Sequence, residues 1–325
     1  MIFRRKITIN ISPEVNMYLA IIIPTWKRVK KLQKCLESLE TQEVSPELVI
    51  ITVRNEDEET CQFLKEKKAK THLNLQIIFL DQPGVIFAEN TAISYVKNLP
   101  EVEVVTFMDD DAIAFPDWIR KIKDFFSHHS KAAALGGPDI IVSESWTYYE
   151  KHVEKVGLIT FAGKVIGNHH HSSKGIRIVD TLKGVNMSIR KDFLELIDSR
   201  LQGVDPAKGN GVFWELDLCL KIKKKMGHIY FDPGLTIHHD SDHKHFIPLS
   251  VTSSTSHNLA LIFFEHFEWR RIIVFIFYSL FIGHSHIKGV LKTAHEVFKT
   301  KNLSAIKDSN YSIRGFLNGI ITWSK

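Results

Sequence analysis

The chain has 325 residues, of which 44% are hydrophobic and 24% charged, an ordinary mix for a folded protein that excludes disordered, collagen-like and low-complexity classes. The net charge of +5 is too small over this length to predict binding to nucleic acid. The whole excess lies near the C-terminus, because residues 251–325 carry nine basic and four acidic side chains. Residues 1–250 are therefore balanced, and a basic surface is expected only in the tail.

Cysteine usage and apolar runs restrict the cellular compartment. Cys35, Cys61 and Cys219 are too few and too scattered for a disulfide framework or a zinc ribbon. The first 15 residues lack the apolar segment of a secretory signal. The longest apolar run, residues 272–282, is shorter than the roughly 20 residues that a transmembrane helix needs. We expect a cytoplasmic protein, with peripheral attachment to the inner face of the cell membrane left open.

Strand and helix patterns alternate four times in the first 111 residues. Residues 18–26 form a continuous apolar run, typical of a strand buried on both faces, and residues 28–42 have the spacing of an amphipathic helix. The alternation continues with strands at 47–55, 75–84 and 102–111 and with helices at 57–70 and 87–99. This order predicts an α/β fold with a mostly parallel central sheet flanked by helices. Ligands of such sheets bind at the carboxyl ends of the strands.

The second half of the chain is less regular. A strand and turn are predicted at 132–139, a loop-rich stretch at 143–180, and a strand, turn and helix at 177–194. Residues 213–227 have the pattern of an amphipathic helix closed by a glycine, and residues 228–239 the pattern of a strand. After residue 248 turn signals are sparse, and mostly helices are expected.

Three consecutive carboxylates, Asp109, Asp110 and Asp111, follow the fourth buried strand. Three adjacent carboxylates do not all ionise cheaply without a counter-charge, and Mg²⁺ or Mn²⁺ supplies one. Such a cation takes diphosphate oxygens as further ligands. The alternative is a solvated acidic turn.

Two further groups of polar residues are candidates for the same site. Glu215 and Asp217 begin a predicted helix, where they either serve the helix dipole alone or place one general base in a cleft. His238 or His239, at the end of a predicted strand, would complete a metal site, and imidazole suits Mn²⁺ better than Mg²⁺. His243 and His245 are weaker candidates, and a histidine-rich surface loop is the alternative. The three histidines at 169–171 are read either as a mobile loop over the site or as an exposed polar loop.

Six segments in this order, spread over residues 20–239, resemble the family 2 glycosyltransferases of the GT-A fold. They are IIIPTWKR, QPGVIFAEN, FMDDD, GVNMSIR, WELDLCLK and PGLTIHH, starting at residues 21, 82, 107, 184, 214 and 233. The resemblance implies a donor-binding set, namely Pro24, Thr25, Arg28, Gly84, Asn90, Asp109 and Asp110. It implies a pocket for the donor sugar and the acceptor, lined by Gly184, Asn186, Met187, Arg190 and Trp214.

The resemblance also implies roles in catalysis and metal binding. Glu215 falls on the position of the catalytic base, with Asp217 in a supporting role. Asp109 and Asp111 hold the metal with His239, which the spacing favours over His238.

The chain departs from the family pattern at three places. The loop TVRNEDEET at 52–60 lacks the usual early Asp, so recognition of the base is expected to fall to Arg54 and Asp57, and the nucleotide stays open. Glu89 stands where relatives have Arg. Trp214 and Glu215 replace a Glu-Asp pair, which makes the base one methylene longer.

The function implied is inverting transfer of a sugar, dependent on Mg²⁺ or Mn²⁺, from a nucleoside-diphosphate sugar to a hydroxyl acceptor. Residues 1–248 would form the catalytic domain and residues 249–325 a helical accessory region. That region either packs on the catalytic domain or lies on a bilayer. A lipid-linked or other glycan is the expected acceptor, in synthesis of cell-surface polysaccharide, lipopolysaccharide or lipid-linked glycans, with a membrane surface as partner and no nucleic acid. A metal-dependent phosphohydrolase and a non-catalytic nucleotide-sugar-binding or membrane scaffold are the alternatives.

Overall fold

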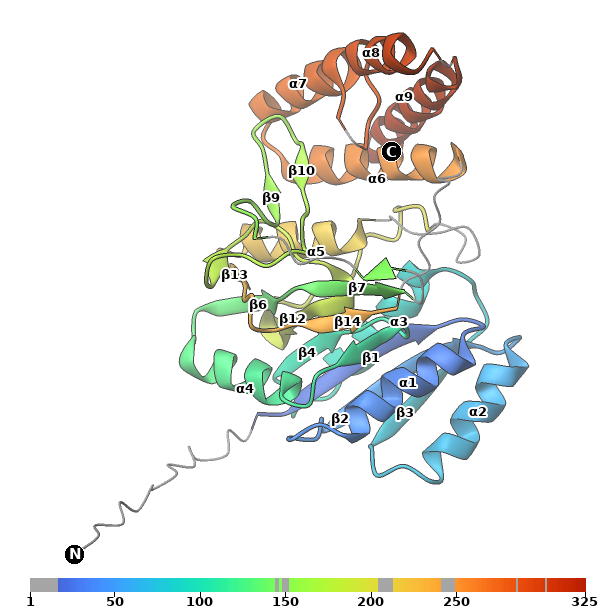
Figure 1. The fold of residues 1–325 in the computed structure, drawn as a ribbon, viewed down its shortest axis with the longest axis vertical. Helices are drawn as coiled ribbons and strands as arrows, with labels where there is room; N and C mark the ends of the chain where they lie inside the picture. Colours follow the sequence, from blue (N-terminus) through green and yellow to red (C-terminus); the bar gives the residue numbers. More distant parts are fainter. Residues whose placement is uncertain are drawn as a thin grey trace, which may run out of the picture.

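The four predicted N-terminal strands form one half of an eight-stranded sheet (Figure 1). The computed structural model describes residues 17–143, 146–147, 152–203, 213–240, 249–284, 286–301 and 303–325. Strands β1 (Leu19–Thr25), β2 (Leu48–Arg54), β3 (Leu75–Leu80) and β4 (Val104–Phe107) are parallel, in the order β3-β2-β1-β4. Helices α1 (Val29–Glu40), α2 (Glu58–Lys68) and α3 (Val85–Lys97) connect them. The predicted alternation is confirmed.

Strand β1 contributes to two hydrophobic cores, one on each face of the sheet. Ala20 and Ile22 pack in one core, whereas Leu19, Ile21 and Ile23 pack in the other. Successive side chains of a strand point to opposite faces, so a strand that is covered on both sides needs an unbroken apolar run. This requirement explains the apolar sequence from residue 19 to residue 23.

The other half of the sheet is mixed. β12 (Met187–Arg190) lies antiparallel between β4 and β6 (Ala132–Gly136), β13 (His228–Phe231) is parallel to β6, and β11 (Arg177–Ile178) is antiparallel to β13. The prediction of a helix at the end of 177–194 is wrong, because β12 and a 3₁₀ turn, η2 (Lys191–Phe193), lie there. The backbone N–H and C=O of Ile197 instead bond the side chain of Asn90, which holds this segment extended.

A second, four-stranded sheet lies beside the carboxyl end of β4. Its order is β5 (Ala112–Ala114), β14 (Ile237–His239), β7 (Asp139–Ser143) and β8 (Trp146–Thr147). A hairpin of β9 (Leu158–Ile159) and β10 (Val165–Ile166) rises towards the C-terminal helices (Figure 1). The sequence analysis did not predict β5, the hairpin or helix α4 (Trp118–His128). The predicted helix at 213–227 is confirmed as α5 (Trp214–Lys224).

The tail is helical, as predicted, and packs on the catalytic sheet through α5. It contains α6 (Leu249–His266), α7 (Trp269–Phe277), the π-helical turn η3 (Tyr278–Ile282), α8 (Val290–Thr300) and α9 (Ser304–Trp323). A Cβ on Gly315 of α9 would lie 2.1 Å from the carbonyl oxygen of Ser253, so glycine permits α9 to cross α6 closely. Phe263, Phe275 and Phe316 belong to the same hydrophobic core as the strands.

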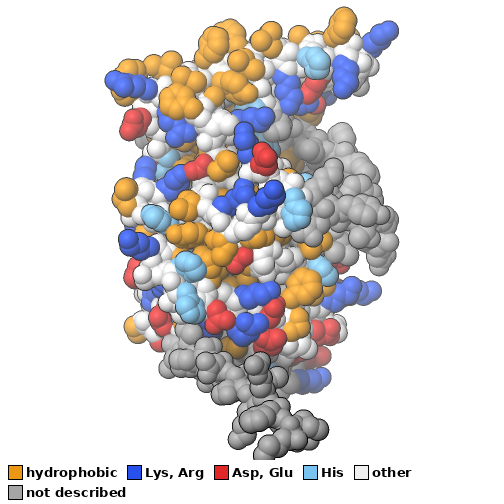
Figure 2. Space-filling model, turned by 60° about the vertical axis from the view of Figure 1, so that its left-hand side comes forward, with side chains coloured by type: hydrophobic (Ala, Val, Ile, Leu, Met, Phe, Trp, Pro, Cys, Tyr) orange, Lys and Arg blue, Asp and Glu red, His pale blue; other side chains and the backbone are white. Residues whose placement is uncertain are grey.

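The surface of these helices is rich in hydrophobic side chains, which Figure 2 shows gathered at the top of the molecule with Lys and Arg among them. Within the described ranges, no helix is both long enough and apolar enough to cross a membrane.

Candidate active site

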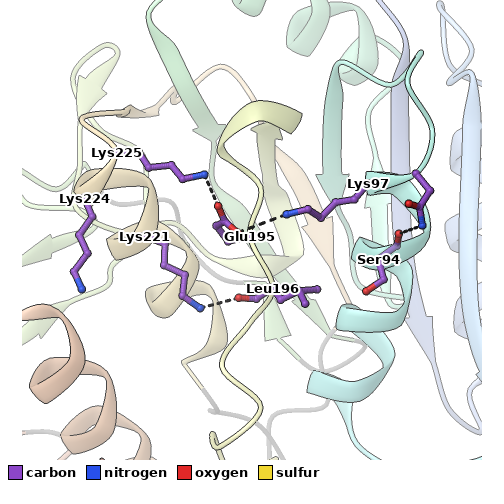
Figure 3. Close-up of a pocket in the computed structure, with 8 residues that line it drawn as sticks. Ser94, Lys97, Glu195, Leu196, Lys221, Lys224 and Lys225 are labelled. Atoms are coloured by element: carbon purple, nitrogen blue, oxygen red, sulfur yellow. Dashed lines mark hydrogen bonds and ion pairs between the residues drawn. The ribbon is translucent and has the colours of Figure 1, made fainter.

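An open groove of about 630 Å³ lies where the C-terminal ends of α3 and α5 meet the segment after η2 (Figure 3). Lysines dominate its lining, and they bond neighbouring groups of the protein. Lys97 and Lys225 pair with Glu195, and Nζ of Lys221 donates to the carbonyl oxygen of Leu196 at 2.7 Å. None of the predicted site residues lines this groove. The predicted chemistry therefore has to be found elsewhere, at the carboxyl end of β4.

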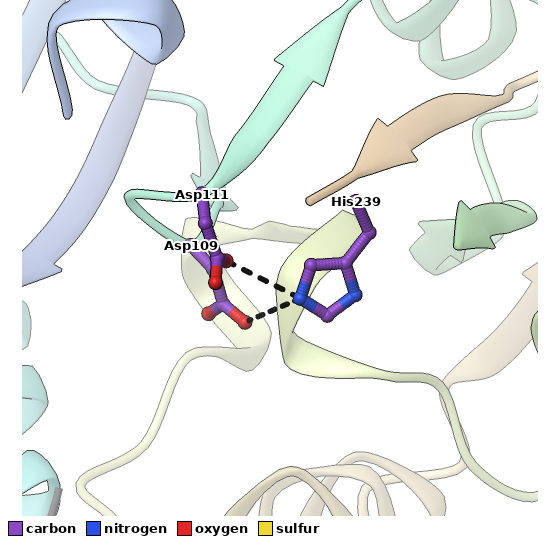
Figure 4. Close-up of side chains that lie close together, drawn as sticks. All are labelled: Asp109, Asp111 and His239. Atoms are coloured by element: carbon purple, nitrogen blue, oxygen red, sulfur yellow. Dashed lines mark ion pairs between the residues drawn. The ribbon is translucent and has the colours of Figure 1, made fainter. Parts of the chain in front are cut away.

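Two members of the acidic triplet, Asp109 and Asp111, meet His239 between β4 and β5 (Figure 4). Strand β14 pairs with β5 so that His239 lies opposite Ala112, the residue after the triplet. Nε2 of His239 is 3.2 Å from Oδ1 of Asp111 and 3.8 Å from Oδ2 of Asp109. One ligand atom from each of the three residues lies within 4.8 Å of the others, so Asp109, Asp111 and His239 form a possible metal site.

Both ring nitrogens of His239 face carboxylates. The hydrogen bonding of these nitrogens indicates whether a cation fits between His239 and the acidic residues. Nδ1 is 3.0 Å from Oδ2 of the buried Asp139, on the side away from Asp111. A neutral imidazole carries one N–H, so hydrogen bonding at Nδ1 leaves the Nε2 lone pair facing two carboxylates. Burial lowers the pKa of His239, but its hydrogen bonds to Asp111 and Asp139 raise it to about 9. The arrangement needs a proton or a metal ion at Nε2, and the donor set of two carboxylates and one imidazole fits Mn²⁺ or Mg²⁺.

Asp139 and Lys183 support this cluster, and the sequence analysis missed both. Asp139 starts β7 opposite Ile237 of β14, and its carboxylate pairs with the ammonium of Lys183 as well as with His239. Burial raises the pKa of Asp139, but Lys183 and His239 outweigh it and hold the pKa well below its usual range. Asp139 follows a Gly-Gly-Pro turn at the start of a strand, a position that could have marked it as a candidate.

The structure brings Thr25 and Arg28 to the triplet. Thr25 donates to Oδ2 of Asp110 at 2.7 Å, and the guanidinium of Arg28 lies 2.9 Å from Oδ1 of Asp110 and 2.7 Å from Oδ2 of Asp111. Asp110 is buried, and burial raises its pKa to about 7. The side chain of Asp109 is 40% exposed, so it is the member of the triplet that is open to a ligand. Asp110 fastens the loop between β1 and α1.

The loops that follow β1 and β2, predicted to bind the nucleotide, contact each other through a hydrogen bond and a cation–π contact. Oδ2 of Asp57 accepts from the backbone N–H of Lys27 at 2.6 Å, while Oδ1 caps α2. The guanidinium of Arg54 stacks on the ring of Trp26, 4.1 Å from its centroid, and pairs with Glu56. Pro24 lies opposite Thr52 in the neighbouring strand β2. Pro24, Arg54 and Asp57 therefore lie at the same edge of the sheet, where β1 and β2 end. We call these three residues the platform.

The residues around the start of α3 have different roles. Gly84 precedes the helix with φ of +114°, a conformation that favours glycine. Asn90 is occupied by the backbone of Ile197. Glu89 is buried, and burial, together with the charges of Asp109 and Glu215, raises its pKa well above the usual range. The charge of Glu89 is therefore coupled to Asp109 of the possible metal site and to the predicted base.

The structure brings together only some of the residues that were predicted to line the sugar pocket. Gly184 lies against the ring of Trp214, where a Cβ would be 2.4 Å from Cζ2. Asn186 is buried, accepts from Nε1 of Trp118 at 3.1 Å and donates to the carbonyl oxygen of Leu235 at 2.8 Å. Met187 is buried opposite Phe107.

Arg190 is not brought to the site. It pairs with Val104 at the opposite end of β4 and donates to the carbonyl oxygens of Ala132 and Phe126. These contacts hold β12 to β6 and α4, and they use the guanidinium of Arg190 within the protein.

Glu215 and Asp217 separate at the start of α5. Burial raises the pKa of the half-buried Glu215 to about 7, with a further rise from Asp109 and an opposing effect of the backbone N–H and Lys183. Asp217 is buried and turned towards α6. It accepts from His266 at 2.8 Å, from Lys221 at 2.6 Å and from the backbone N–H of Asp198 at 2.9 Å. Asp217 supports α5 by tying it to its surroundings.

Among the residues that the structure describes, His239 is the histidine of this cluster, and the other histidines have different surroundings. The ring of His238 packs edge-on against Phe115, with centroids 4.7 Å apart, while the ring of its neighbour His239 contacts the acidic triplet. His243 and His245 lie outside the described residues. His169 and His171 are buried, and Nε2 of His169 bonds the carbonyl oxygen of Thr181 at 2.9 Å, so the interpretation of 169–171 as an exposed polar loop is wrong.

Solved structures share this architecture. The chain aligns with a crystal structure of S. aureus TarS with a TM-score of 0.58 and 15% identity, over 93% of this chain and 81% of that one. Another structure of TarS in complex with UDP-GlcNAc gives 0.57. GalNAc-T7 with UDP, GalNAc and Mn²⁺ gives 0.60 with 13% identity, over 81% of this chain and 50% of that one. The mostly parallel sheet with its acidic edge therefore defines a GT-A fold.

Sequence comparison gives the family. A family model described as glycosyltransferase like family 2 matches residues 16–269, more than three quarters of the chain. The chain belongs to the family 2 glycosyltransferases, as the sequence motifs predicted. The glucosyl-dolichyl phosphate glucuronosyltransferase of Haloferax volcanii is 28% identical over 194 residues. The chain spans about half of that relative, 55% of its length.

Proposed function

We propose that the protein transfers a sugar from a nucleoside-diphosphate sugar to a hydroxyl acceptor, with inversion at the anomeric carbon and dependence on Mg²⁺ or Mn²⁺. The observation that carries this proposal is the cluster of Asp109, Asp111 and His239 together with Glu215, a carboxyl group whose pKa is raised to about 7 by burial and by the charge of Asp109. Membership of the glycosyltransferase family supports the reaction type.

The metal cluster would bind the diphosphate of the donor. Asp109, Asp111 and His239 would hold the cation, which when bound supplies positive charge to the departing diphosphate. Asp139 fixes the ring of His239, because a partner at one imidazole nitrogen sets which nitrogen is left for the metal. Thr25 and Arg28 keep the acidic loop in place through Asp110 and Asp111.

Glu215 would act as the general base. An acceptor hydroxyl is a poor nucleophile at neutral pH, and a carboxylate with a pKa near 7 is well matched to take its proton during attack. A single displacement assisted by one base needs no covalent intermediate and inverts the anomeric carbon. Asp217, held by His266 and Lys221, keeps the first turn of α5 in position.

Other residues would contact the two substrates. Pro24, Arg54 and Asp57 form the platform proposed for the nucleotide, with Trp26 as an added candidate because Arg54 stacks on it. Gly84, Asn90 and Asp110 would shape the donor site rather than contact it, since Asn90 and Asp110 already have protein partners. Trp214, packed on Gly184, would form the wall of the sugar pocket, with Asn186 and Met187 buried behind it. Arg190 is left out of the pocket.

The comparisons suggest classes of donor and acceptor. TarS binds UDP-GlcNAc and the GalNAc-T7 structure contains UDP, GalNAc and Mn²⁺, which supports a nucleotide-sugar donor. The Haloferax relative is named for a dolichyl phosphate substrate, which supports a lipid-linked glycan as acceptor. We therefore propose a peripheral enzyme on the inner face of the cell membrane, acting in synthesis of a lipid-linked or cell-surface glycan. A phosphohydrolase would leave Glu215 and the family match without a role.

Replacing the base tests the proposed reaction. Glu215→Gln should lower turnover by about 10²–10⁴-fold, since it removes proton transfer but keeps the shape of the side chain. Nucleotide release from a sugar donor, measured with a cell-membrane glycolipid extract as acceptor, reports turnover. Glu66→Gln, on the exposed side of α2, is the matched control and should behave as wild type. Near-normal transfer by Glu215→Gln would refute the role of the base.

A further inference from the structure

A stripe of large apolar side chains runs along the outside of α7 and η3. Trp269, Ile273, Phe277 and Phe281 recur every four residues and are 66%, 57%, 58% and 52% exposed. Residues four apart lie on one side of a helix, and the rings of Phe277 and Phe281 are 4.9 Å apart, so the stripe is continuous. Isolated exposed apolar residues are ordinary on protein surfaces, but an ordered row of them marks an interaction site.

The opposite side of the same helix is already used by the core. Phe275 is fully buried and packs against Phe263, Phe267 and Phe316. The outer stripe is therefore not needed to hold α7 in place. Helix α8 adds exposed Val290, Leu291 and Phe298, of which Phe298 is 88% exposed. Figure 1 shows α7 and α8 crossing the end of the molecule that lies beyond α6, and Figure 2 shows hydrophobic side chains covering this end.

The basic charge of the tail indicates the kind of partner that this surface would bind. The tail holds the entire +5 excess of the chain, and Arg270, Lys299 and Lys301 are exposed beside the apolar residues. The guanidinium of Arg270 lies 5.4 Å from the ring centroid of Trp269. Apolar residues with tryptophan and bordering basic residues suit the interface of a bilayer that contains anionic lipid. A second copy of the same basic surface would be repelled.

We propose that α7, η3 and α8 form a docking surface that inserts its apolar side chains into the interface of an anionic bilayer. In this arrangement the helices lie in the plane of the membrane and do not cross it. We call the residues Trp269, Ile273, Phe277, Phe281, Val290, Leu291 and Phe298 the docking stripe.

Hydrogen bonds connect α7 and the end of the preceding helix α6 to the hairpin and to α5. Asp217 of α5 bonds His266 at the end of α6, and Arg271 of α7 donates to the carbonyl oxygen of Thr160 in the hairpin, at 3.1 Å. Docking would therefore fix the orientation of α5, and with it Glu215, relative to the bilayer. This consequence rests on the proposed function, because it gives Glu215 an acceptor that is embedded in lipid, whereas binding of the membrane itself does not depend on catalysis.

Liposome flotation of the full chain tests the surface. Wild-type protein should float with vesicles of phosphatidylcholine and phosphatidylglycerol and much less with phosphatidylcholine alone. Phe277→Ser/Phe281→Ser should lower the partition coefficient by on the order of tenfold or more, since each exposed phenylalanine loses its apolar burial in lipid. Phe79→Ser/Ile178→Ser is the matched control, because these side chains are 42% and 59% exposed on strands at the two edges of the central sheet. The control should float as wild type.

Arg270→Gln/Lys299→Gln separates charge from apolar burial. This variant should lose binding to anionic vesicles by several-fold and show little change with phosphatidylcholine. The docking surface is refuted if wild type binds neither vesicle, or if the Phe277→Ser/Phe281→Ser variant floats as well as the control. It is also refuted if light scattering finds a dimer that this variant abolishes while vesicle binding is absent, since a second copy would then cover the stripe.

Diphosphate binding on the same preparations distinguishes this inference from the proposed function. Titration with UDP, GDP and dTDP in Mn²⁺ should be unchanged by the stripe variants, because the stripe lies away from the metal cluster. Vesicle binding without diphosphate binding would support the docking surface and refute the proposed function. Diphosphate binding without vesicle binding would do the reverse.

Discussion

His239 lies between two buried carboxylates, and this position controls how the metal site responds to pH. In the protein without a metal, hydrogen bonds to Asp111 and Asp139 raise the pKa of His239 to about 9 against the effect of burial. A metal ion at Nε2 must displace that proton. Lower pH therefore favours the protonated ring and weakens metal binding, whereas higher pH favours the metal.

Mn²⁺ affinity is expected to rise by up to about tenfold per pH unit between pH 6.5 and 7.5, since one proton leaves His239 for each ion bound. Calorimetric titration with Mn²⁺ alone at the two pH values measures the effect. His239→Ala should abolish the dependence together with most of the binding, and His238→Ala should keep both, because His238 packs on Phe115. An affinity that does not change with pH would contradict the proposed role of His239.

The raised pKa of Glu215 predicts a pH profile for turnover. The base must be deprotonated to accept a proton, and its pKa of about 7 means that it is mostly protonated below that pH. The rate should therefore rise with pH through about 7 and fall about tenfold per unit below it. Initial rates at saturating donor from pH 5.5 to 8.5 measure this limb. A rate that stays constant down to pH 5.5 would exclude Glu215 as the titrating group.

The motifs predicted the three residues that form the possible metal site but not the residues that support them. Spacing favoured His239 over His238, and the structure places His239 on Asp111. Asp139 and Lys183 belong to no motif, and their pairing depends on β7 lying beside β14. Asn90, Asn186 and Arg190 matched the motifs, yet their polar groups are bonded within the protein. A motif gives a residue type and a spacing, whereas the partner of a polar side chain is decided by packing.

At the scale of elements, the geometry of α5 directs the two acidic residues of one motif, Glu215 and Asp217, to different sides of the helix. Residues two apart on a helix are separated by about 200° around its axis. Glu215 can therefore face the acidic cluster while Asp217 contacts His266 and Lys221. Hydrogen bonds from His266 and Lys221 overcome the effect of burial and lower the pKa of Asp217.

Asp217→Asn should destabilise the fold by about 3 kcal/mol, because the buried ring of His266 and the ammonium of Lys221 lose the carboxylate that accepts their hydrogen bonds. Urea unfolding, followed by far-ultraviolet circular dichroism, measures the change in the free energy of unfolding. Asp124→Asn, at a side chain of α4 that is 41% exposed, should cost less than about 0.5 kcal/mol. Equal unfolding midpoints for the two variants would show that Asp217 does not hold α5 to α6.

Element prediction succeeded where the apolar period was long and failed where elements were short. Strands β1 to β4 can be predicted from their apolar runs, because a sheet that is covered on both faces requires such runs. Strands β5, β9 and β10 have two or three residues each, too few for any period to be detected. The segment after β12 carries a helical pattern but is held extended by Asn90, a contact 107 residues distant in sequence.

At the scale of the whole molecule, the tail and the catalytic sheet share one hydrophobic core. Phe263 of α6 is fully buried, stacks on Phe267 with centroids 4.3 Å apart, and belongs to the cluster that includes Ile22 of β1. The predicted boundary at residue 248 therefore divides the sequence but not the core. Removing residues 249–325 would expose that core, so point variants are the sharper way to study the tail.

Phe263→Ala should lower the free energy of unfolding by about 3–5 kcal/mol, through lost burial and the cavity that remains. Differential scanning calorimetry should show one cooperative transition, shifted to lower temperature as a whole. Phe281→Ala, which removes an exposed ring from the same region, should leave the transition within about 1 kcal/mol of wild type. Two separate transitions, with only one shifted by Phe263→Ala, would contradict the shared core.

Divalent-dependent binding of a nucleoside diphosphate tests whether Asp109, Asp111 and His239 hold a metal ion for a sugar donor. Calorimetric titration with UDP, GDP and dTDP, each with Mn²⁺ and with EDTA, should find at least one diphosphate that binds only with Mn²⁺. Asp109→Asn should weaken that binding by about tenfold or more, since Asp109 is the exposed ligand of the cluster. Asp117→Asn, on the surface at the start of α4, should not weaken it. Binding that is equal in Mn²⁺ and EDTA, or absent for all three nucleotides, would contradict a metal-dependent transferase that uses a nucleoside-diphosphate sugar.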